Sequence, residues 1–265
     1  MMQLSFDLIS DLHLETWEEK FNWNHMPTST ICVVAGDISC DKMLAVECLA
    51  HLANLYNAVI YIDGNDEHKT STSSIEQSTY ELYTMTKPIP NLYFLKETVT
   101  VIDGVAFIGC NGWWTYDFVD PESYDLTKQW VIDRLGIDMQ KASEFENLSN
   151  RDTSYISRSI EKLQTHPDVK QIVVISHTVP CPSLVEHDVE IEGTHILNSM
   201  GNSRIINCLK QDTEGKIHTW CFGHYHGGSI DQLKYGVRFV SNPKGRGNTK
   251  WCNPYYNPKR IVIDF

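Results

Sequence analysis

Five short apolar runs, each followed at once by polar side chains, constrain the fold of this chain more than any other feature. Runs such as ICVVA and IVVIS are continuous rather than alternating, which is typical of strands buried on both faces of a parallel sheet. Ligands of open α/β sheets bind at the carboxyl ends of such strands. We therefore expect five strands to deliver polar side chains to one edge of the fold, and the runs cover residues 4–10, 30–35, 58–63, 171–176 and 217–222.

The rest of the chain alternates strand and helix signals. Asp103-Gly104 joins two further apolar runs and is a strong hairpin signal. The first half reads β-α-β-α-β and hairpins follow, so we predict an α/β layered sandwich with two mixed β-sheets flanked by α-helices. Segment 113–152 is rich in aromatic and charged residues and is expected to form helices and loops over one end. Further strands are expected at 91–96, 98–102, 105–110, 238–241 and 260–264, and helices at 42–56, 72–86, 155–164 and 203–210.

The spread of the candidate site residues along the chain indicates the number of domains. A length of 265 residues allows one domain or two. The candidate site residues run from Asp11 to His226 and must meet in one fold. We therefore expect a single domain over residues 1–265.

Charge and hydropathy exclude several classes of partner. The chain has 22 Lys and Arg against 34 Asp and Glu, a formal net charge of −12. Such a balance argues against extended binding to nucleic acid or to an anionic membrane, but it allows one phosphate ester in a pocket. No apolar run reaches the ~18 residues of a membrane span, and the first residues lack the positive charge of a signal peptide. We expect a cytoplasmic protein.

The polar residues at the strand ends form a donor set for metal ions. Asp11 and His13 are two residues apart, so they project to one side of an extended backbone, and His224 and His226 share that spacing. Mixed nitrogen and oxygen donors without thiolates suit Mn²⁺, Fe, Zn²⁺ or Ni²⁺. The set is too large for one tetrahedral ion and matches two ions that share a carboxylate. The seven candidates are Asp11, His13, Asp37, Asn65, His177, His224 and His226.

The ordered motifs D-x-H, G-D, G-N-x-[ED], a lone His after a strand, and G-H-x-H resemble those of the calcineurin-like metallophosphoesterases. Residues 241–245 (SNPKG) are similar to the N-P-[RK]-G stretch of small bacterial and phage members. If the protein is encoded by a phage, the expected compartment is the cytoplasm of the host cell. The G-x-x-x-W pattern of 109–113 is similar as well. Each motif is weak alone, but five in order, each after an expected strand, are specific.

The resemblance implies two divalent metal ions, with Mn²⁺ favoured over Fe, Zn or Ni. It also implies that a water or hydroxide between the ions attacks phosphorus in line while the ions polarise the phosphoryl oxygens. One ion would be bound by Asp11, His13 and His226, the other by Asn65, His177 and His224, with Asp37 as the bridge.

The residue after Asn65 departs from the family pattern. Most phosphomonoesterase members have a His there that is thought to protonate the leaving group, whereas this chain has Asp66. Asn65 and Asp66 are our candidate catalytic residues, but Asp66 can act as an acid only if its pKa is raised, and nearby cations lower it. His68 could act instead, or Asp66 and Glu67 could be first-turn acids of a helix. A weak general acid favours phosphodiesters over monoesters.

We therefore predict a dinuclear metal-dependent phosphoesterase that acts on a small phosphoester, with a nucleotide-like ester as one candidate. A nuclease that acts on nucleic-acid ends is the alternative enzyme, against which the net charge of −12 counts. A catalytically weak metal-binding interaction scaffold is the alternative of another class, against which the complete ligand set counts. The oligomeric state stays open.

Three residues are candidates for contact with substrate: His195, Trp113 and Lys244. His195 lies between two of the metal motifs. Trp113, with Trp114 beside it, could form an aromatic wall that stacks on a base, or part of the core. Lys244 and Arg246 belong to a basic cluster that is either a solvated loop or a rim that contacts phosphate.

Overall fold

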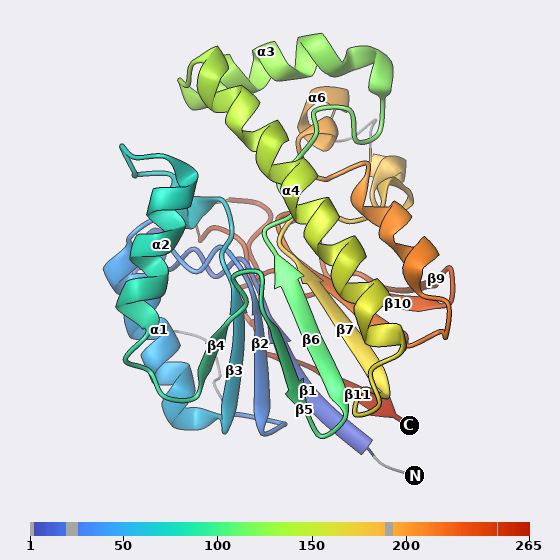
Figure 1. The fold of residues 1–265 in the computed structure, drawn as a ribbon. Coiled ribbons are helices and arrows are strands. Elements are labelled where there is room, and N and C mark those ends of the chain that lie inside the picture. The colour runs from blue at the N-terminus through green and yellow to red at the C-terminus, as the bar shows by residue number, and fades with distance from the viewer. Residues whose placement is uncertain (1–2, 20–25, 189–192, 248) are drawn as a thin grey trace.

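The computed structural model describes residues 3–19, 26–188, 193–247 and 249–265, and these form two β-sheets packed face to face with helices outside (Figure 1). One sheet has the strand order β11-β1-β2-β3-β4 and the other β5-β6-β7-β8-β10-β9. The predicted α/β sandwich with two mixed sheets is confirmed. The strands are β1 Gln3–Ile9, β2 Ile31–Ala35, β3 Ala58–Ile62, β4 Leu92–Phe94, β5 Val99–Ile102, β6 Val105–Cys110, β7 Gln171–Ser176, β8 Ile217–Phe222, β9 Asp231–Lys234, β10 Val237–Ser241 and β11 Lys259–Asp264.

The first sheet is parallel from β1 to β4, and β11 pairs antiparallel with β1. The helices that connect β2, β3 and β4 cover its outer face, and a side chain caps the N-terminus of each helix. The Asp41 side chain accepts hydrogen bonds from the backbone N–H groups of Met43 and Leu44, and the Ser74 hydroxyl accepts one from Gln77. These two helices are α1 Lys42–Leu55 and α2 Ile75–Thr86.

The second sheet is mixed because strands at both of its edges run antiparallel. The β5–β6 hairpin turns at Asp103 and Gly104, whose φ angles of 47° and 83° are those of the expected tight turn. Strand β9 was not predicted. Its sequence DQLK has no apolar run, because alternate residues of this edge strand are exposed.

The helices differ most from prediction in the second half of the chain. Helix α4 is 26 residues long, whereas only its last ten were predicted. Segment 203–210 forms a 3-10 helix rather than an α-helix. The α-helices here are α3 Tyr124–Leu135, α4 Met139–Gln164 and α6 Thr194–Asn198, and the 3-10 helices of the chain are η1 Leu14–Thr16, η2 Asp66–His68, η3 Pro121–Ser123, η4 Pro182–Leu184, η5 Glu186–Asp188 and η6 Ile205–Gln211.

A buried apolar layer joins the two sheets. The ring of Phe6 in β1 meets the ring of Phe107 in β6 edge to face, with centroids 5.8 Å apart. Val33 of β2 and Val173 of β7 belong to the same cluster. Helix α4 covers the outer face of the second sheet, so each sheet is buried on both sides over most of its strands.

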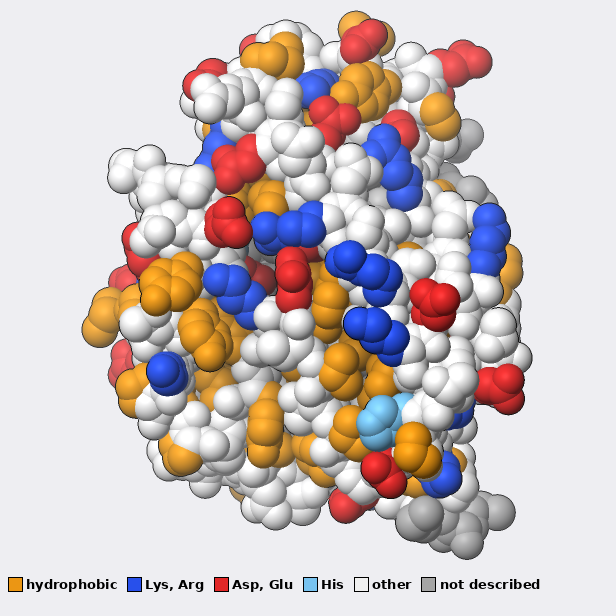
Figure 2. Space-filling view, viewed as in Figure 1, with side chains coloured by type: hydrophobic (Ala, Val, Ile, Leu, Met, Phe, Trp, Pro, Cys, Tyr) orange, Lys and Arg blue, Asp and Glu red, His pale blue; other side chains and the backbone are white. Residues whose placement is uncertain are grey.

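One face of the molecule carries charges of both signs. Figure 2 shows the face that carries α4, where basic and acidic side chains lie interspersed rather than separated into one broad basic patch. Among the described residues no helix is both long and apolar enough to cross a bilayer.

Candidate metal centre

The polar residues that follow the strands converge at one end of the sandwich. Among the described residues, three groups of three have ligand atoms that all lie within 4.8 Å of one another. One group, His13, Glu15 and Asp66, follows strands of the first sheet alone. The other two groups draw on both sheets, because residues that follow β1 and β2 meet residues that follow β7 and β8. These two groups are Asp11, His13 and His226, and Asp37, His177 and His224.

The backbone at this end is strained. Asp11, His13, Asp37 and His224 have φ angles of 51°, 43°, 56° and 65°, in the left-handed region that non-glycine residues rarely adopt. Hydrogen bonds hold these conformations: Asp11 N–H donates to Gly36 O at 3.0 Å, and His224 N–H donates to Asp11 Oδ1 at 2.8 Å. Such strain is concentrated at functional sites, where it fixes side-chain direction.

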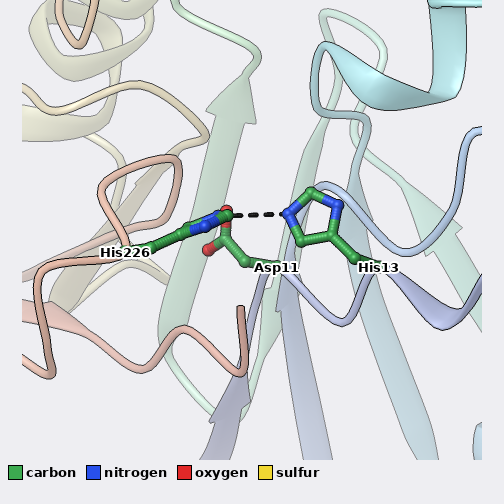
Figure 3. Close-up of side chains that lie close together, drawn as sticks. All are labelled: Asp11, His13 and His226. Carbon is green, nitrogen blue, oxygen red and sulfur yellow. Dashed lines mark hydrogen bonds and ion pairs between the residues drawn. The ribbon is translucent and has the colours of Figure 1, made fainter. Parts of the chain in front are cut away.

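In the first group, two imidazole rings face one carboxylate (Figure 3). His13 Nε2 lies 3.1 Å from His226 Nε2, and His226 Nε2 lies 3.2 Å from Asp11 Oδ1. The other oxygen, Asp11 Oδ2, is buried and has no hydrogen-bond partner among the described residues. An orphaned carboxylate oxygen beside two converging ring nitrogens fits a bound cation, which would satisfy all three.

In the second group, His177 is oriented by a backbone carbonyl. Its Nδ1 lies 2.9 Å from Ala35 O, to which it donates, so the lone pair of Nε2 is directed into the site. Nε2 lies 3.1 Å from Asn65 Oδ1 and 3.3 Å from Asp37 Oδ1. The second oxygen of Asp37 lies 3.7 Å from His13 Nε2, so this carboxylate stands between the two groups.

The site attracts positive charge. Burial lowers the pKa of His177, but the charge and hydrogen bond of Asp37, together with the charge of Asp11 and the carbonyl of Ala35, outweigh burial and raise this pKa to about 10. Burial, and then the charge of His177, lower the pKa of His224 to about 4. Burial raises the pKa of Asp11, but the hydrogen bond with His226 and the charges of His226, His177 and His13 together hold the pKa well below its usual range. A divalent cation would replace the proton that His177 otherwise carries.

Glu67 holds the strand-end loops together. Its carboxylate accepts hydrogen bonds from the N–H groups of Asp37, Ile38 and Gly64 at 3.1, 2.7 and 2.8 Å. Burial, assisted by the charge of Asp37, raises the pKa of Glu67 to about 8. The motif G-N-x-[ED] included this position, but the pattern did not reveal its anchoring contacts.

Asp66 lies between His13 and Arg246, a member of the basic cluster that the sequence offered as a rim for phosphate. Asp66 Oδ2 is 3.2 Å from His13 Nδ1 and contacts the guanidinium of Arg246, which also lies 3.6 Å from Glu15 Oε1. Burial raises the pKa of Asp66, but His13 and then Arg246 outweigh it and hold the pKa well below its usual range. No pattern in the sequence links Asp66 to a residue 180 positions away.

A cavity of about 260 Å³ opens on the two groups. Its lining combines candidate metal ligands and Arg246 with apolar side chains such as Ile196 and Met200. The lining residues are His13, Asp37, Asn65, Ile196, Met200, His224, Tyr225, His226, Gly227, Arg246 and Trp251.

The three residues expected to contact substrate do not line this cavity. Trp113 is buried and stacks on Phe145, with ring centroids 4.9 Å apart. His195 lies in α6, where its Nδ1 is 3.2 Å from the hydroxyl of Thr127. The ammonium of Lys244 is buried over the ring of Trp17, and burial lowers the pKa of Lys244 to about 7.

Trp114 and His68 were also considered from the sequence, and the structure shows the contacts of both. Trp114 stacks on the ring of His224, with centroids 5.6 Å apart, so it supports a proposed ligand. Both ring nitrogens of His68 are engaged, one with Asp63 and one with Ser78, at 2.9 Å each. His68 is not among the residues that line the cavity.

No protein-family model and no curated protein matches the sequence. Several solved structures match the fold, among them the following two. A phosphopantetheinyl hydrolase from Mycobacterium tuberculosis is 16% identical, with a TM-score of 0.70 and coverage of 94% of each chain. A dimetal phosphatase from Danio rerio is 14% identical, with a TM-score of 0.56 and coverage of 98% of this chain and 91% of the other. The chain therefore has the calcineurin-like metallophosphoesterase fold.

Proposed function

We propose that residues 1–265 form one domain and that this domain is a phosphoesterase that depends on two divalent metal ions. The observation that carries the proposal is the pair of ligand groups at one end of the sandwich, with the Asp37 carboxylate between them. The two structural neighbours, a hydrolase and a dimetal phosphatase, support it.

The proposed ligands divide as the two groups do. The mixed nitrogen and oxygen donors favour Mn²⁺, with Fe, Zn²⁺ or Ni²⁺ as alternatives. Asp37 would be shared by both ions, since its two oxygens face different groups. Asp11, His13 and His226 would hold one ion, and Asn65, His177 and His224 would hold the other.

The chain's own groups then bind and orient the ester. When bound, two divalent cations supply Lewis acidity and activate water for attack on phosphorus. The planar guanidinium of Arg246 faces the cavity, and its fork of N–H donors matches phosphate oxygens. The organic part of the substrate lies against the apolar lining residues Ile196, Met200 and Trp251.

We further propose that phosphodiesters are better substrates than monoesters. A leaving alkoxide needs a proton donor, and the carboxyl of Asp66 is held ionised by His13 and Arg246. Esters whose leaving group is already stable as an anion depend less on such a donor, as do diesters whose leaving oxygen is assisted by a metal ion. The cytoplasm is the compartment in which we propose that this protein acts.

Hydrolysis of bis(p-nitrophenyl) phosphate tests the proposed function. We expect turnover that requires added Mn²⁺ and that falls by about 10² or more in His224→Ala, because a ligand is lost. His218→Ala is the matched control, since this half-buried histidine lies in β8, at the end away from the site. Wild-type protein without Mn²⁺-dependent turnover would contradict the proposal, as would equal rates in both variants.

A comparison with p-nitrophenyl phosphate tests the substrate preference. We expect a higher kcat/KM for the diester at saturating Mn²⁺. A monoester that is hydrolysed ten times faster than the diester would refute the preference and leave the metal-dependent activity standing.

A further inference from the structure

The carboxylate of Asp66 contacts one ligand of each proposed metal ion. Its Oδ1 accepts a hydrogen bond from the Asn65 amide at 3.0 Å, and its Oδ2 lies 3.2 Å from His13 Nδ1. Its backbone N–H donates to Asp37 Oδ1, the proposed bridge, at 2.8 Å. One buried residue therefore touches three of the seven proposed ligands.

The contact with Asn65 fixes which end of the amide faces the site. Because the NH₂ group donates to Asp66, the carbonyl oxygen is directed at His177 Nε2, 3.1 Å away. A flipped amide would set its oxygen against the Asp66 carboxylate and its NH₂ group toward the cation. Only the observed orientation offers a lone pair to a metal ion.

The contact with His13 favours one tautomer. His13 Nδ1 is buried and lies 3.2 Å from Asp66 Oδ2 without the alignment of a hydrogen bond, so the charge of the carboxylate favours the proton on Nδ1. The lone pair of Nε2 then faces His226 and Asp37. Carboxylates that orient the far nitrogen of a metal-binding histidine commonly raise metal affinity, and their loss lowers it about 10- to 100-fold.

Arg246 secures this arrangement from the other side. Its guanidinium contacts Asp66 Oδ2 and lies 3.6 Å from Glu15 Oε1. Both oxygens of Asp66 are therefore engaged, one by Asn65 and the other by His13 and Arg246. Asp66 is also absent from the residues that line the cavity, so it faces ligands rather than the space where a leaving group would lie.

We propose that Asp66 is a positioning residue, held by Arg246, that orients His13 and Asn65 for the two metal ions and does not protonate the leaving group. This inference rests on the proposed function.

Metal binding gives the first test, by calorimetric titration of metal-free protein with Mn²⁺. We expect Asp66→Ala to bind Mn²⁺ about 10- to 100-fold more weakly than wild type. Asp66→Asn keeps the size of the side chain but offers only one acceptor, so it should fall between the two. Asp152→Asn is the control, because it changes another buried carboxyl without touching a proposed ligand.

The leaving group gives the second test. A positioning role predicts that the rate of Asp66→Ala relative to wild type, at saturating Mn²⁺, is the same for diesters of p-nitrophenol, phenol and ethanol. A general acid predicts a ratio that worsens as the leaving group becomes more basic, with unchanged Mn²⁺ affinity.

The outcomes separate the two proposals. An active wild type together with wild-type Mn²⁺ affinity in Asp66→Ala would overturn the positioning role alone. A wild type that neither binds Mn²⁺ nor hydrolyses the diester would overturn the proposed function. If Asp66→Ala does not fold, as judged by its thermal transition, Asp66→Asn carries both measurements.

Discussion

Two basic residues close together in the sequence have different surroundings in the structure. Lys244 is buried over Trp17, whereas Arg246 reaches the cavity and Asp66. Residues two apart on an extended chain share a side, so the sequence alone could not separate them. Gly245, with φ of 78°, breaks this alternation between them.

Replacing Arg246 should weaken binding of the phosphate group of the substrate. We expect Arg246→Ala to lower kcat/KM for the diester by about 10²-fold at saturating Mn²⁺, with a large part in KM, because a charge-assisted contact to phosphate is lost. Arg246→Lys should recover little, since a point charge does not reproduce the planar fork. Steady-state kinetics of both variants measure this, and full recovery by lysine would contradict the bidentate contact.

Asp152 makes stability depend on pH. Burial raises its pKa to about 7, although the N–H of Gly112 donates to the carboxylate at 2.8 Å. The unfolded chain releases this proton near pH 4, so the folded state binds more protons between about pH 4 and 7. The contribution of Asp152 to the free energy of unfolding therefore falls as pH rises through that window.

Asp152→Asn should remove this dependence, because an amide oxygen can still accept from Gly112. We expect the free energy of unfolding of the variant, relative to wild type, to rise by about 2 kcal/mol between pH 5 and pH 8. Urea unfolding at the two pH values measures the difference. A constant difference would show that Asp152 titrates normally.

Some of the individual site residues could be predicted from the sequence. Motif order identified seven residues that the structure brings together, because each motif sits where an apolar strand ends. The places of Trp113 and His195 were not predictable, since spacing does not say whether an aromatic ring faces a cavity or the core. Contacts between distant residues, such as Arg246 with Asp66, leave no local pattern.

At the scale of elements, continuous apolar strands were the most predictable feature. The runs at β2, β3 and β7 match the expected ranges within a residue, because burial on both faces leaves only apolar residues. The first turns of α4 were not predicted, because part of the buried face of this helix is polar. Its buried face includes the polar residues Ser149 and Asp152, which interrupt the apolar period of a helix.

The start of α1 gives a test at this scale. Asp41 Oδ1 accepts from Met43 N–H at 2.9 Å and from Leu44 N–H at 3.4 Å. We expect Asp41→Ala to lower the free energy of unfolding by about 1 kcal/mol, while Asp41→Ser loses much less. Urea unfolding compares the two. Equal losses in both variants would mean that the cap is not what the substitution removes.

For the whole molecule, the alternation of strands and helices sufficed to predict the sandwich. It did not give the order of the strands, such as β11 beside β1 or β10 beside β8, because pairing between distant strands depends on packing rather than on local pattern.

Metal binding should stabilise the whole fold, since the proposed ligands belong to loops of both sheets. At a free Mn²⁺ concentration 100 times Kd we expect about 2.7 kcal/mol of added stability, reversed by a chelator. His226→Ala should show much less of this gain, whereas His218→Ala should keep it. Thermal unfolding with and without Mn²⁺ measures both, and an unchanged transition in wild type would count against a metal site.

The layer between the sheets has a consequence for the chemistry. Each group of proposed ligands takes residues from loops of both sheets, so the spacing between the sheets sets the distances between ligands. That spacing is determined by buried contacts such as Phe6 with Phe107, far along the strands from any ligand. We therefore expect that substitutions in this apolar layer can change which metal ion binds best while every proposed ligand stays the same.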